Sequence, residues 1–150
     1  MAKKKIEISI HSFGIYTPWK SKGKEIPKPV EFTTDIPITP DVEFGYVLRI
    51  KNGRREKITF RTEHPPFKDA NGKVMPPFTG VEHIKENNYL LFIGDTVWEP
   101  IETKAGRWRI TAYHNRKVVA DKVFTLFSQP LKPLKYRKGG GGATDTVPLA

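Results

Sequence analysis

Apolar and polar residues alternate one by one along several segments of this chain. In the clearest one, residues 44–51, every even position holds Phe, Tyr, Leu or Ile. Successive side chains of a β-strand point to opposite faces, so this pattern indicates a strand with one face against a core. Residues 6–10 and 106–112 alternate in the same way. No amphipathic helix longer than two turns is visible, and the chain is predicted to be mostly β-sheet.

Turn signals separate these segments and suggest how they connect. Asn52-Gly53 lies between the strand at 44–51 and a second alternating run at 57–62, which predicts a β-hairpin. A tight turn is expected at His114-Asn115. Gly94-Asp95 is expected to turn the chain after a strand at 89–93, whose continuous apolar residues indicate burial on both sides.

Other strands are predicted with local irregularities. The first strand is expected to continue to Tyr16 with a bend at Gly14. One strand is expected over residues 30–39. In the last strand, residues 117–127, Val118-Val119 interrupts the alternation and predicts a β-bulge.

About seven to eight short strands separated by turns indicate an all-β sandwich or barrel. Residues 1–128 are predicted to form this domain. It would carry a basic loop at 17–29 and a proline-rich loop at 64–80. Residues 129–150 include four consecutive glycines and are predicted to be a basic, Gly-rich disordered tail, because such a composition buries too little surface to offset the entropy of ordering.

The chain has 150 residues and no cysteine. The absence of cysteine excludes disulfides, thiolate metal sites and a cysteine nucleophile, and it favours a reducing compartment. The N-terminal apolar residues alternate with polar ones, whereas a signal peptide needs a continuous apolar stretch. No stretch approaches the 18 or so apolar residues of a membrane span. The protein is therefore expected to be cytoplasmic.

A set of short motifs occurs in a specific order along the chain. They are Phe13-Gly14-Ile15-Tyr16, Thr33-Thr34-Asp35-Ile36-Pro37, Phe44-Gly45-Tyr46, His64-Pro65-Pro66, Ile93-Gly94-Asp95, Ala105-Gly106-Arg107-Trp108 and Phe124-Thr125-Leu126. This ordered set resembles the bacterial family known as domain of unknown function 3859, over residues 6–127. The resemblance implies an immunoglobulin-like antiparallel β-sandwich, and it implies no reaction.

Residues that could carry catalysis or hold a metal are scattered. None of the four histidines, His11, His64, His83 and His114, has a partner at helical spacing. No Gly-x-Ser-x-Gly elbow is present, and the glycine run is not followed by Lys-Ser/Thr as in a phosphate-binding loop. We therefore expect no catalytic residue, no metal site and no cofactor.

Aromatic residues in two loops are the candidate contacts for a protein partner. Phe67 and Phe78 each follow a Pro-Pro pair in the 64–80 loop, where prolines would hold the backbone extended and partly preorganised. The alternative is that both rings tuck under the loop and close one end of the sandwich. Trp19 lies in the basic loop and either anchors a partner or folds back over the domain. Trp108, which alternates with Ile110, is expected in the core.

The net charge of +10 is concentrated in the flanks. Residues 1–28 carry +5 and residues 130–150 carry +3, which leaves +2 for the rest. Such flanks either keep the protein soluble or attract polyanions through screened electrostatics. The candidate nucleic-acid contacts are Lys3, Lys4, Lys5, Arg107, Arg109, Arg137 and Lys138, with the two strand arginines on one outer sheet face with Tyr113.

The sequence thus predicts a non-enzymatic interaction module that presents loops to a protein partner. The alternative is an accessory protein that associates weakly and non-specifically with nucleic acid through its basic flanks.

Overall fold

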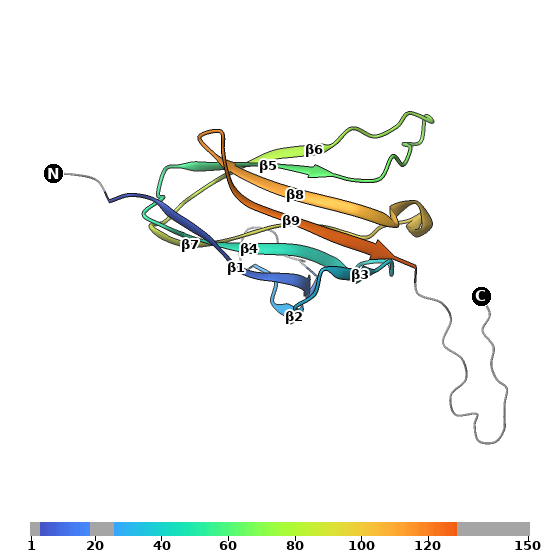
Figure 1. Ribbon diagram of the computed structural model, residues 1–150, viewed down its shortest axis with the longest axis horizontal. Coiled ribbons are helices and arrows are strands. Elements are labelled where there is room, and N and C mark those ends of the chain that lie inside the picture. The colour runs from blue at the N-terminus through green and yellow to red at the C-terminus, as the bar shows by residue number, and fades with distance from the viewer. Residues whose placement is uncertain (1–3, 19–25, 129–150) are drawn as a thin grey trace, which may run out of the picture.

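The computed structural model describes residues 4–18 and 26–128, which form nine β-strands in two sheets (Figure 1). The four-stranded sheet has the order β2 (Pro29–Glu31), β1 (Glu7–Tyr16), β4 (Glu43–Lys51), β7 (Asn88–Thr96). The five-stranded sheet has the order β3 (Asp35–Pro37), β9 (Lys117–Phe127), β8 (Gly106–His114), β5 (Lys57–Glu63), β6 (Phe78–His83). A short 3₁₀ helix, η1 (Ile101–Lys104), links β7 to β8.

The inward face of each sheet carries the apolar half of its alternating strands. Tyr46 and Ile50 of β4 and Trp108 and Ile110 of β8 are almost fully buried between the sheets. The Tyr46 hydroxyl crosses the core and donates a hydrogen bond to the backbone oxygen of Ile110 at 3.0 Å. The predictions of an all-β sandwich and of a buried Trp108 are confirmed. The strands number nine in the described residues, and the β3–β9 pair is parallel where an antiparallel fold was expected.

The predicted hairpin at Asn52-Gly53 is wrong. β4 pairs with β1 along one edge and with β7 along the other, with nine residue pairs in each case. It therefore has no free edge with which β5 could pair. The segment between them instead crosses to the other sheet, with positive φ at Asn52 and Arg55. Gly53 lies against the side chains of Ile50 and Ile6, so a Cβ there would clash. The chain does turn just after the dipeptide, at Arg54-Arg55, where the Glu56 amide donates to the backbone oxygen of Gly53 at 2.9 Å. Non-local pairing decides which sheet the next strand joins.

The strand predicted over residues 30–39 is divided between the two sheets. Its first part is β2, which pairs with β1, and its second part is β3, which pairs with β9. Between them, Thr33 accepts a hydrogen bond from the backbone N–H of Asp35 at 3.0 Å and turns the chain. This crossover passes close to Gly14, where a Cβ would lie 2.0 Å from the backbone oxygen of Glu31. Gly14 is thus required by close backbone approach.

The other local predictions have mixed outcomes. The bulge in the last strand is confirmed, because Ala112 pairs with Ala120 and Tyr113 with Val118. The tight turn is confirmed one residue later than predicted, with positive φ at Asn115 and Arg116. The turn at 94–95 is wrong, since β7 continues through these residues to Thr96.

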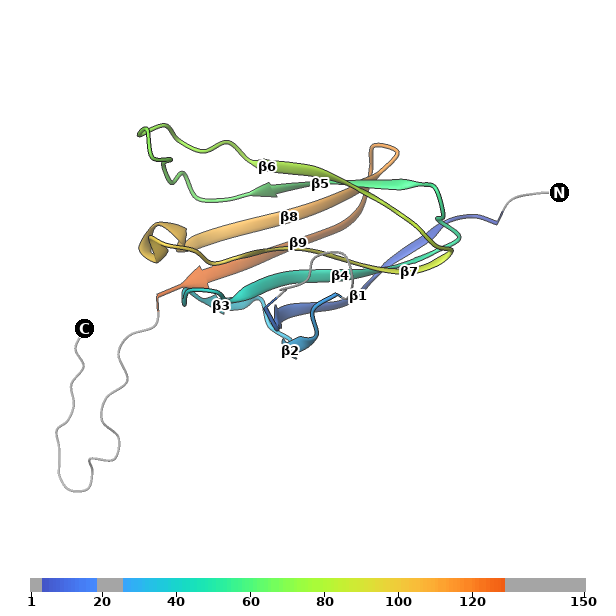
Figure 2. The same ribbon diagram turned by 180° about the vertical axis from the view of Figure 1, so that it is seen from behind.

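The termini of the described region lie at opposite ends of the sandwich (Figures 1 and 2). The tail predicted for residues 129–150 lies outside the described residues, as does Trp19 in the basic loop. Along the part of the chain that is described, no helix is long and apolar enough to cross a membrane.

Candidate interaction surfaces

The proline-rich loop closes one end of the sandwich with an aromatic cluster. Its rings pack at centroid distances of 4.4 to 6.3 Å and belong to His64, Phe67, Phe78, Trp98 and Trp108. Aromatic pairs at such distances contribute beyond their buried area. Phe67 is 7% exposed and belongs to the core, whereas Phe78 is half-buried. Phe67 is therefore not available as an exposed anchor, and its ring covers the sandwich as in the alternative interpretation.

The tip of this loop is organised by Asp69. Its carboxylate accepts hydrogen bonds from the backbone N–H groups of Asn71 at 2.8 Å and Lys73 at 2.9 Å. Gly72 has a φ of 81°, and a short β-bridge joins Lys68 to Val74. The Gly72 amide also donates to the backbone oxygen of Asp69 at 3.0 Å, so Asp69 is the residue that shapes this turn.

A buried lysine completes the aromatic cluster. Lys104 of η1 is only 2% exposed, and its ammonium lies 4.4 Å from the ring centroid of Trp98 and 4.7 Å from that of Phe67. The ammonium donates to the backbone oxygen of Pro100 at 3.1 Å and to the Thr103 hydroxyl at 2.9 Å. Burial lowers the pKa of Lys104. Its structural role is further shown by its backbone oxygen, which accepts the indole N–H of Trp108 at 2.8 Å.

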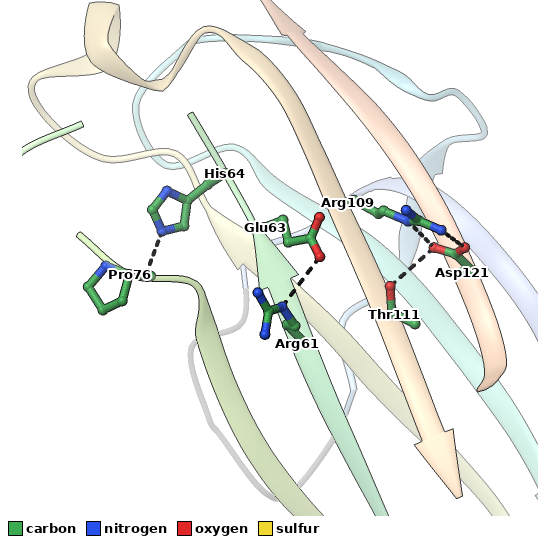
Figure 3. A network of polar contacts seen from close by, with 7 residues as sticks. All are labelled: Arg61, Glu63, His64, Pro76, Arg109, Thr111 and Asp121. Carbon is green, nitrogen blue, oxygen red and sulfur yellow. Dashed lines mark hydrogen bonds and ion pairs between the residues drawn. The ribbon is translucent and has the colours of Figure 1, made fainter. Parts of the chain in front are cut away.

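The outer face of the five-stranded sheet carries paired charges (Figure 3). Arg109 donates from Nε and Nη2 to both carboxylate oxygens of Asp121, at 2.9 and 2.6 Å, and Thr111 donates to the same carboxylate. The hydrogen bond from Arg109 holds the pKa of Asp121 below its usual value. Arg61 pairs with Glu63 at 3.3 Å. Arg107 is exposed and makes no hydrogen bond or ion pair with the residues described here.

An open polar hollow of about 650 Å³ lies beside these pairs, and Glu63, His64, Arg107, Arg109, Asp121, Lys122 and Val123 line it. The structure places Arg107 and Arg109 together on this face as predicted. However, Arg109 is neutralised by Asp121, and Tyr113 is partly buried. Single-stranded nucleic acid needs unpaired cations together with exposed stacking rings. Lys4 and Lys5 are exposed, while Lys3, Arg137 and Lys138 lie outside the described residues.

The outer face of the four-stranded sheet is apolar instead. Tyr16, Val47 and Phe92 form a second buried cluster there, which Ile26 partly covers. The rings of Tyr16 and Phe92 meet edge to face at 5.0 Å. This outer layer explains why the residue run 89–93 is so uniformly apolar, and it confirms that the middle of β7 is buried on both faces.

An apolar hollow of about 520 Å³ adjoins this cluster. It is lined by His11, Ser12, Ile26, Pro27, Lys28, Pro29, Phe32, Val47 and Leu90. Two of its lining residues are exposed, Phe32 to 69% and Leu90 to 39%, and Val30, which follows the lining residue Pro29 in the chain, is 64% exposed. We refer to the hollow together with Phe32, Val30 and Leu90 as the apolar face. Sequence reasoning missed it, because its residues come from β1, β4, β7 and the segment 26–32.

Arg49 lies on the same outer face, in the cross-strand row that contains Ser9 and Leu90. Its side chain is half-buried, and its Nε atom is shielded from solvent without a hydrogen-bond partner. A buried polar atom without a partner is uncommon in native structures and calls for an explanation. The apolar face therefore has beside it an arginine whose Nε atom has no hydrogen-bond partner among the described residues.

One carboxylate points between the sheets. Asp95 of β7 pairs with the inward-facing Phe44 and accepts the backbone N–H of Thr96 at 2.8 Å. Burial raises the pKa of Asp95 to about 6, and the nearby Glu43 adds to this rise. The electrostatic interaction with His64 acts on the Asp95 pKa in the opposite direction. Among the described residues no three His, Asp or Glu side chains gather as they would around a metal ion.

Two stacked sheets with a buried core between them define a β-sandwich. The sequence matches the family described as domain of unknown function (DUF3859) over residues 4–126, and the chain belongs to this family. A search of curated proteins gave no match.

Two solved structures are similar to this chain to different degrees. The crystal structure of an immunoglobulin-like protein from Pseudomonas aeruginosa has a TM-score of 0.69 at 18% identity, over 85% of this chain and 100% of that one. The alkylpurine DNA glycosylase AlkC of Pseudomonas fluorescens, bound to DNA containing an abasic site analogue, has a TM-score of 0.39 at 11% identity. That match covers 83% of this chain and 32% of that chain. The immunoglobulin-like fold implied by the motifs is confirmed.

Proposed function

We propose that this immunoglobulin-like domain is a non-enzymatic interaction module and that it binds a protein partner through the apolar face. The observation that carries the proposal is the exposure of Phe32 and Leu90 in the lining of an apolar hollow, with the exposed Val30 next to the lining residue Pro29 in the chain. Isolated exposed apolar residues are ordinary, but apolar residues gathered around a concavity are typical of interaction sites.

The composition of this surface supports a protein as the partner. Interfaces are enriched in aromatic residues and arginine at their centres and have polar rims. Here Phe32 lines the hollow, Arg49 lies in the adjoining row, and Lys28, His11 and Ser12 supply polar groups around it. Two prolines at positions 27 and 29 restrict the backbone of the segment that forms one wall, which lowers the entropy lost on binding.

The partner site thus differs from the loop site expected from sequence. The 64–80 loop commits Phe67 to the core, so a partner would meet at most the half-buried Phe78 there. The nucleic-acid alternative depends on the basic flanks, since Asp121 neutralises one of the two strand arginines. Retention on heparin at low salt, lost at moderate salt and unaffected by Phe32→Ser, would support that alternative.

A photo-crosslinking amino acid at position 32 tests the proposal. In cells that contain the partner, we expect a discrete crosslinked species from position 32 and none from position 118, where Val118 is 58% exposed on the other sheet. Phe32→Ser combined with Val30→Ser should abolish recovery of that species in a pull-down and leave the melting temperature nearly unchanged. Equal crosslinking from both positions, or recovery that survives the double substitution, would contradict the proposal.

A further inference from the structure

Arg49 stands at the border of the apolar hollow. In the register of the four-stranded sheet it lies directly opposite Leu90 of β7, and on its own strand it is two residues from Val47. Side chains two residues apart share a face of the sheet, and directly opposed side chains are cross-strand neighbours. Because Leu90 and Val47 both line the hollow, the Arg49 side chain is placed beside whatever occupies it.

The guanidinium of Arg49 has donors and no acceptor. Arginine carries five N–H donors and a permanent positive charge. The half-buried Arg49 makes no hydrogen bond or ion pair with another described residue, and its Nε atom is shielded from solvent. Arg109 on the other sheet is more exposed, yet it donates twice to Asp121. Shielding a charged donor without giving it an acceptor is unfavourable, so Arg49 is poorly accommodated in the free domain.

The surroundings of Arg49 contain no carboxylate that could complete its bonding. The residues that line the hollow include Lys28 and no aspartate or glutamate. Glu7 of β1 lies one row further along the sheet, opposite Lys51, and Glu31 of β2 is exposed. Neither glutamate forms an ion pair with Arg49 in the described part of the chain. The border of the hollow is therefore positively charged, and a carboxylate would complement it.

A β-bulge turns polar groups of the first strand toward the same hollow. Ile10 pairs with Leu48 and Ser12 pairs with Val47, so His11 is the extra residue of the bulge. Both His11 and Ser12 line the hollow. Bulges re-aim side chains and are over-represented next to functional sites. The hollow thus has an apolar floor, a polar margin and a cation without a partner.

We propose that the occupant of the apolar face is a protein segment that carries an Asp or Glu side chain close to a bulky apolar residue. This inference rests on the proposed function and adds the chemistry of the partner. The apolar residue would fill the hollow beside Phe32 and Leu90, and the carboxylate would accept hydrogen bonds from the guanidinium of Arg49. Arginine and carboxylate form strong bidentate pairs, which also fix the orientation of the bound segment.

The shielded Nε restricts how this pair can form. A carboxylate approaching from solvent meets the terminal nitrogens of Arg49 first, because these are not shielded as Nε is. Rotation of the Arg49 side chain would then bring Nε to the second carboxylate oxygen. Binding would thus supply the acceptor that the free domain lacks, and the cost of the unpaired donor would become part of the preference for an acidic partner.

A library of random peptides displayed on phage, selected on the purified domain, tests this preference. Binders of the apolar face are recognised because Phe32→Ser abolishes their binding. We expect these peptides to share an Asp or Glu at a fixed spacing from an aromatic or large aliphatic residue. Arg49→Gln should weaken their binding about tenfold or more, as for a hydrogen bond to a charged group. Arg107→Gln, which changes an exposed arginine on the other sheet, should leave binding unchanged.

Charge exchange then tests the pair itself. Replacing the acidic residue of a selected peptide by Lys should abolish binding to the wild type, and Arg49→Glu should restore part of it. Peptides that require Phe32 but show no acidic preference, or that bind Arg49→Gln as tightly as the wild type, would overturn this inference and leave the proposed function intact. Recovery of no Phe32-dependent peptide would count against both.

The stability of the free domain separates recognition from a structural role. Arg49→Met keeps the apolar stem of the side chain and removes the guanidinium, which has no hydrogen bond to lose. The melting temperature should therefore stay the same or rise, while acidic peptides bind more weakly. A clear fall in the melting temperature of Arg49→Met would show that the guanidinium supports the fold, and it would overturn the inference.

Discussion

The two sheets of this sandwich treat their outer faces differently. The five-stranded sheet turns its charges outward and pairs them in solvent, as in Arg109 with Asp121. The four-stranded sheet covers its outer face with Tyr16, Val47 and Phe92, and it keeps Arg49 half-buried beside them. Strand alternation alone predicts a wet outer face for both sheets. The difference shows that the four-stranded sheet carries an apolar cluster on its outer face, whereas the described outer face of the five-stranded sheet carries ion pairs.

The comparison also concerns how each sheet uses its carboxylates. Asp121 lies in the open and gains a guanidinium partner, which lowers its pKa. Asp95 lies between the sheets, and burial raises its pKa. A carboxylate is thus stabilised on one sheet and destabilised on the other, so the two should respond to pH in opposite directions.

The largest expected effect is at Phe92, which is 3% exposed although it is on an outer face. Phe92→Ala should lower the free energy of unfolding by about 3 kcal/mol, as for a core phenylalanine. Val118→Ala on the other sheet, where the side chain is 58% exposed, should change it by less than about 0.5 kcal/mol. Urea denaturation measures both. Equal effects would mean that the two outer faces are alike.

The next effect is at Asp95. Its folded pKa of about 6 exceeds the ordinary value of 3.8, so the folded state binds more protons and stability falls as pH rises from about 4 to 6. Asp95→Asn keeps the acceptor for the Thr96 amide and removes the buried charge. The substitution should raise the free energy of unfolding at pH 7.5 by about 2 kcal/mol, and it should reduce the loss of stability between about pH 4 and pH 6. Destabilisation at pH 7.5 would show that the ionised carboxylate is well accommodated.

Asp121 should behave in the opposite sense and more weakly. Because the pKa of Asp121 is lowered in the folded state, its ionised carboxylate stabilises the fold at pH values above its ordinary pKa. This stabilisation is lost as the pH falls through the folded-state pKa. Because the pair is about half exposed, Asp121→Asn should cost no more than about 1 kcal/mol at pH 7. The cost should shrink in high salt. A loss above about 2 kcal/mol would indicate a structural role for the outer charges.

The smallest stability effect belongs to the apolar face itself. Phe32→Ser should leave the unfolding free energy within about 0.5 kcal/mol, since the side chain is mostly exposed. The same change should reduce binding of an apolar fluorescent dye, and Val118→Ser should not. A large loss of stability would show that Phe32 packs as part of the buried cluster that contains Phe92.

Much of the strand pattern was predictable because it is local. Alternation places Trp108 inward and Arg107 outward, and the doubled Val118-Val119 marks the bulge that the structure contains. The error at Asn52-Gly53 has a physical cause. A turn dipeptide determines local backbone direction, whereas the partner of β5 depends on β4 having both edges occupied by strands distant in sequence.

The surfaces were less predictable for the same reason. The apolar face needs Val47, Leu90 and Phe32 to meet from three separate segments. No partner of His64 is visible in the sequence. The fold brings the backbone oxygen of Pro76 to its ring. The 64–80 loop left two interpretations of Phe67, and the choice between them depended on Trp98 and Trp108, which come later in the chain.

Because β3 pairs with β9, the last strand of the domain, the strands cannot all pair in the order in which they are synthesised. The backbone N–H of Ile38 bonds to Phe127, and that of Thr125 bonds to Thr34, so residues some ninety positions apart complete one sheet edge. A ribosome emits the chain from its N-terminus, and β1 with β4 can pair as soon as residue 51 has emerged. The fully buried Ile36 must wait for residues 125–127. During synthesis, β3 therefore stays unpaired until β9 has emerged, and folding of the domain is completed only by this last strand.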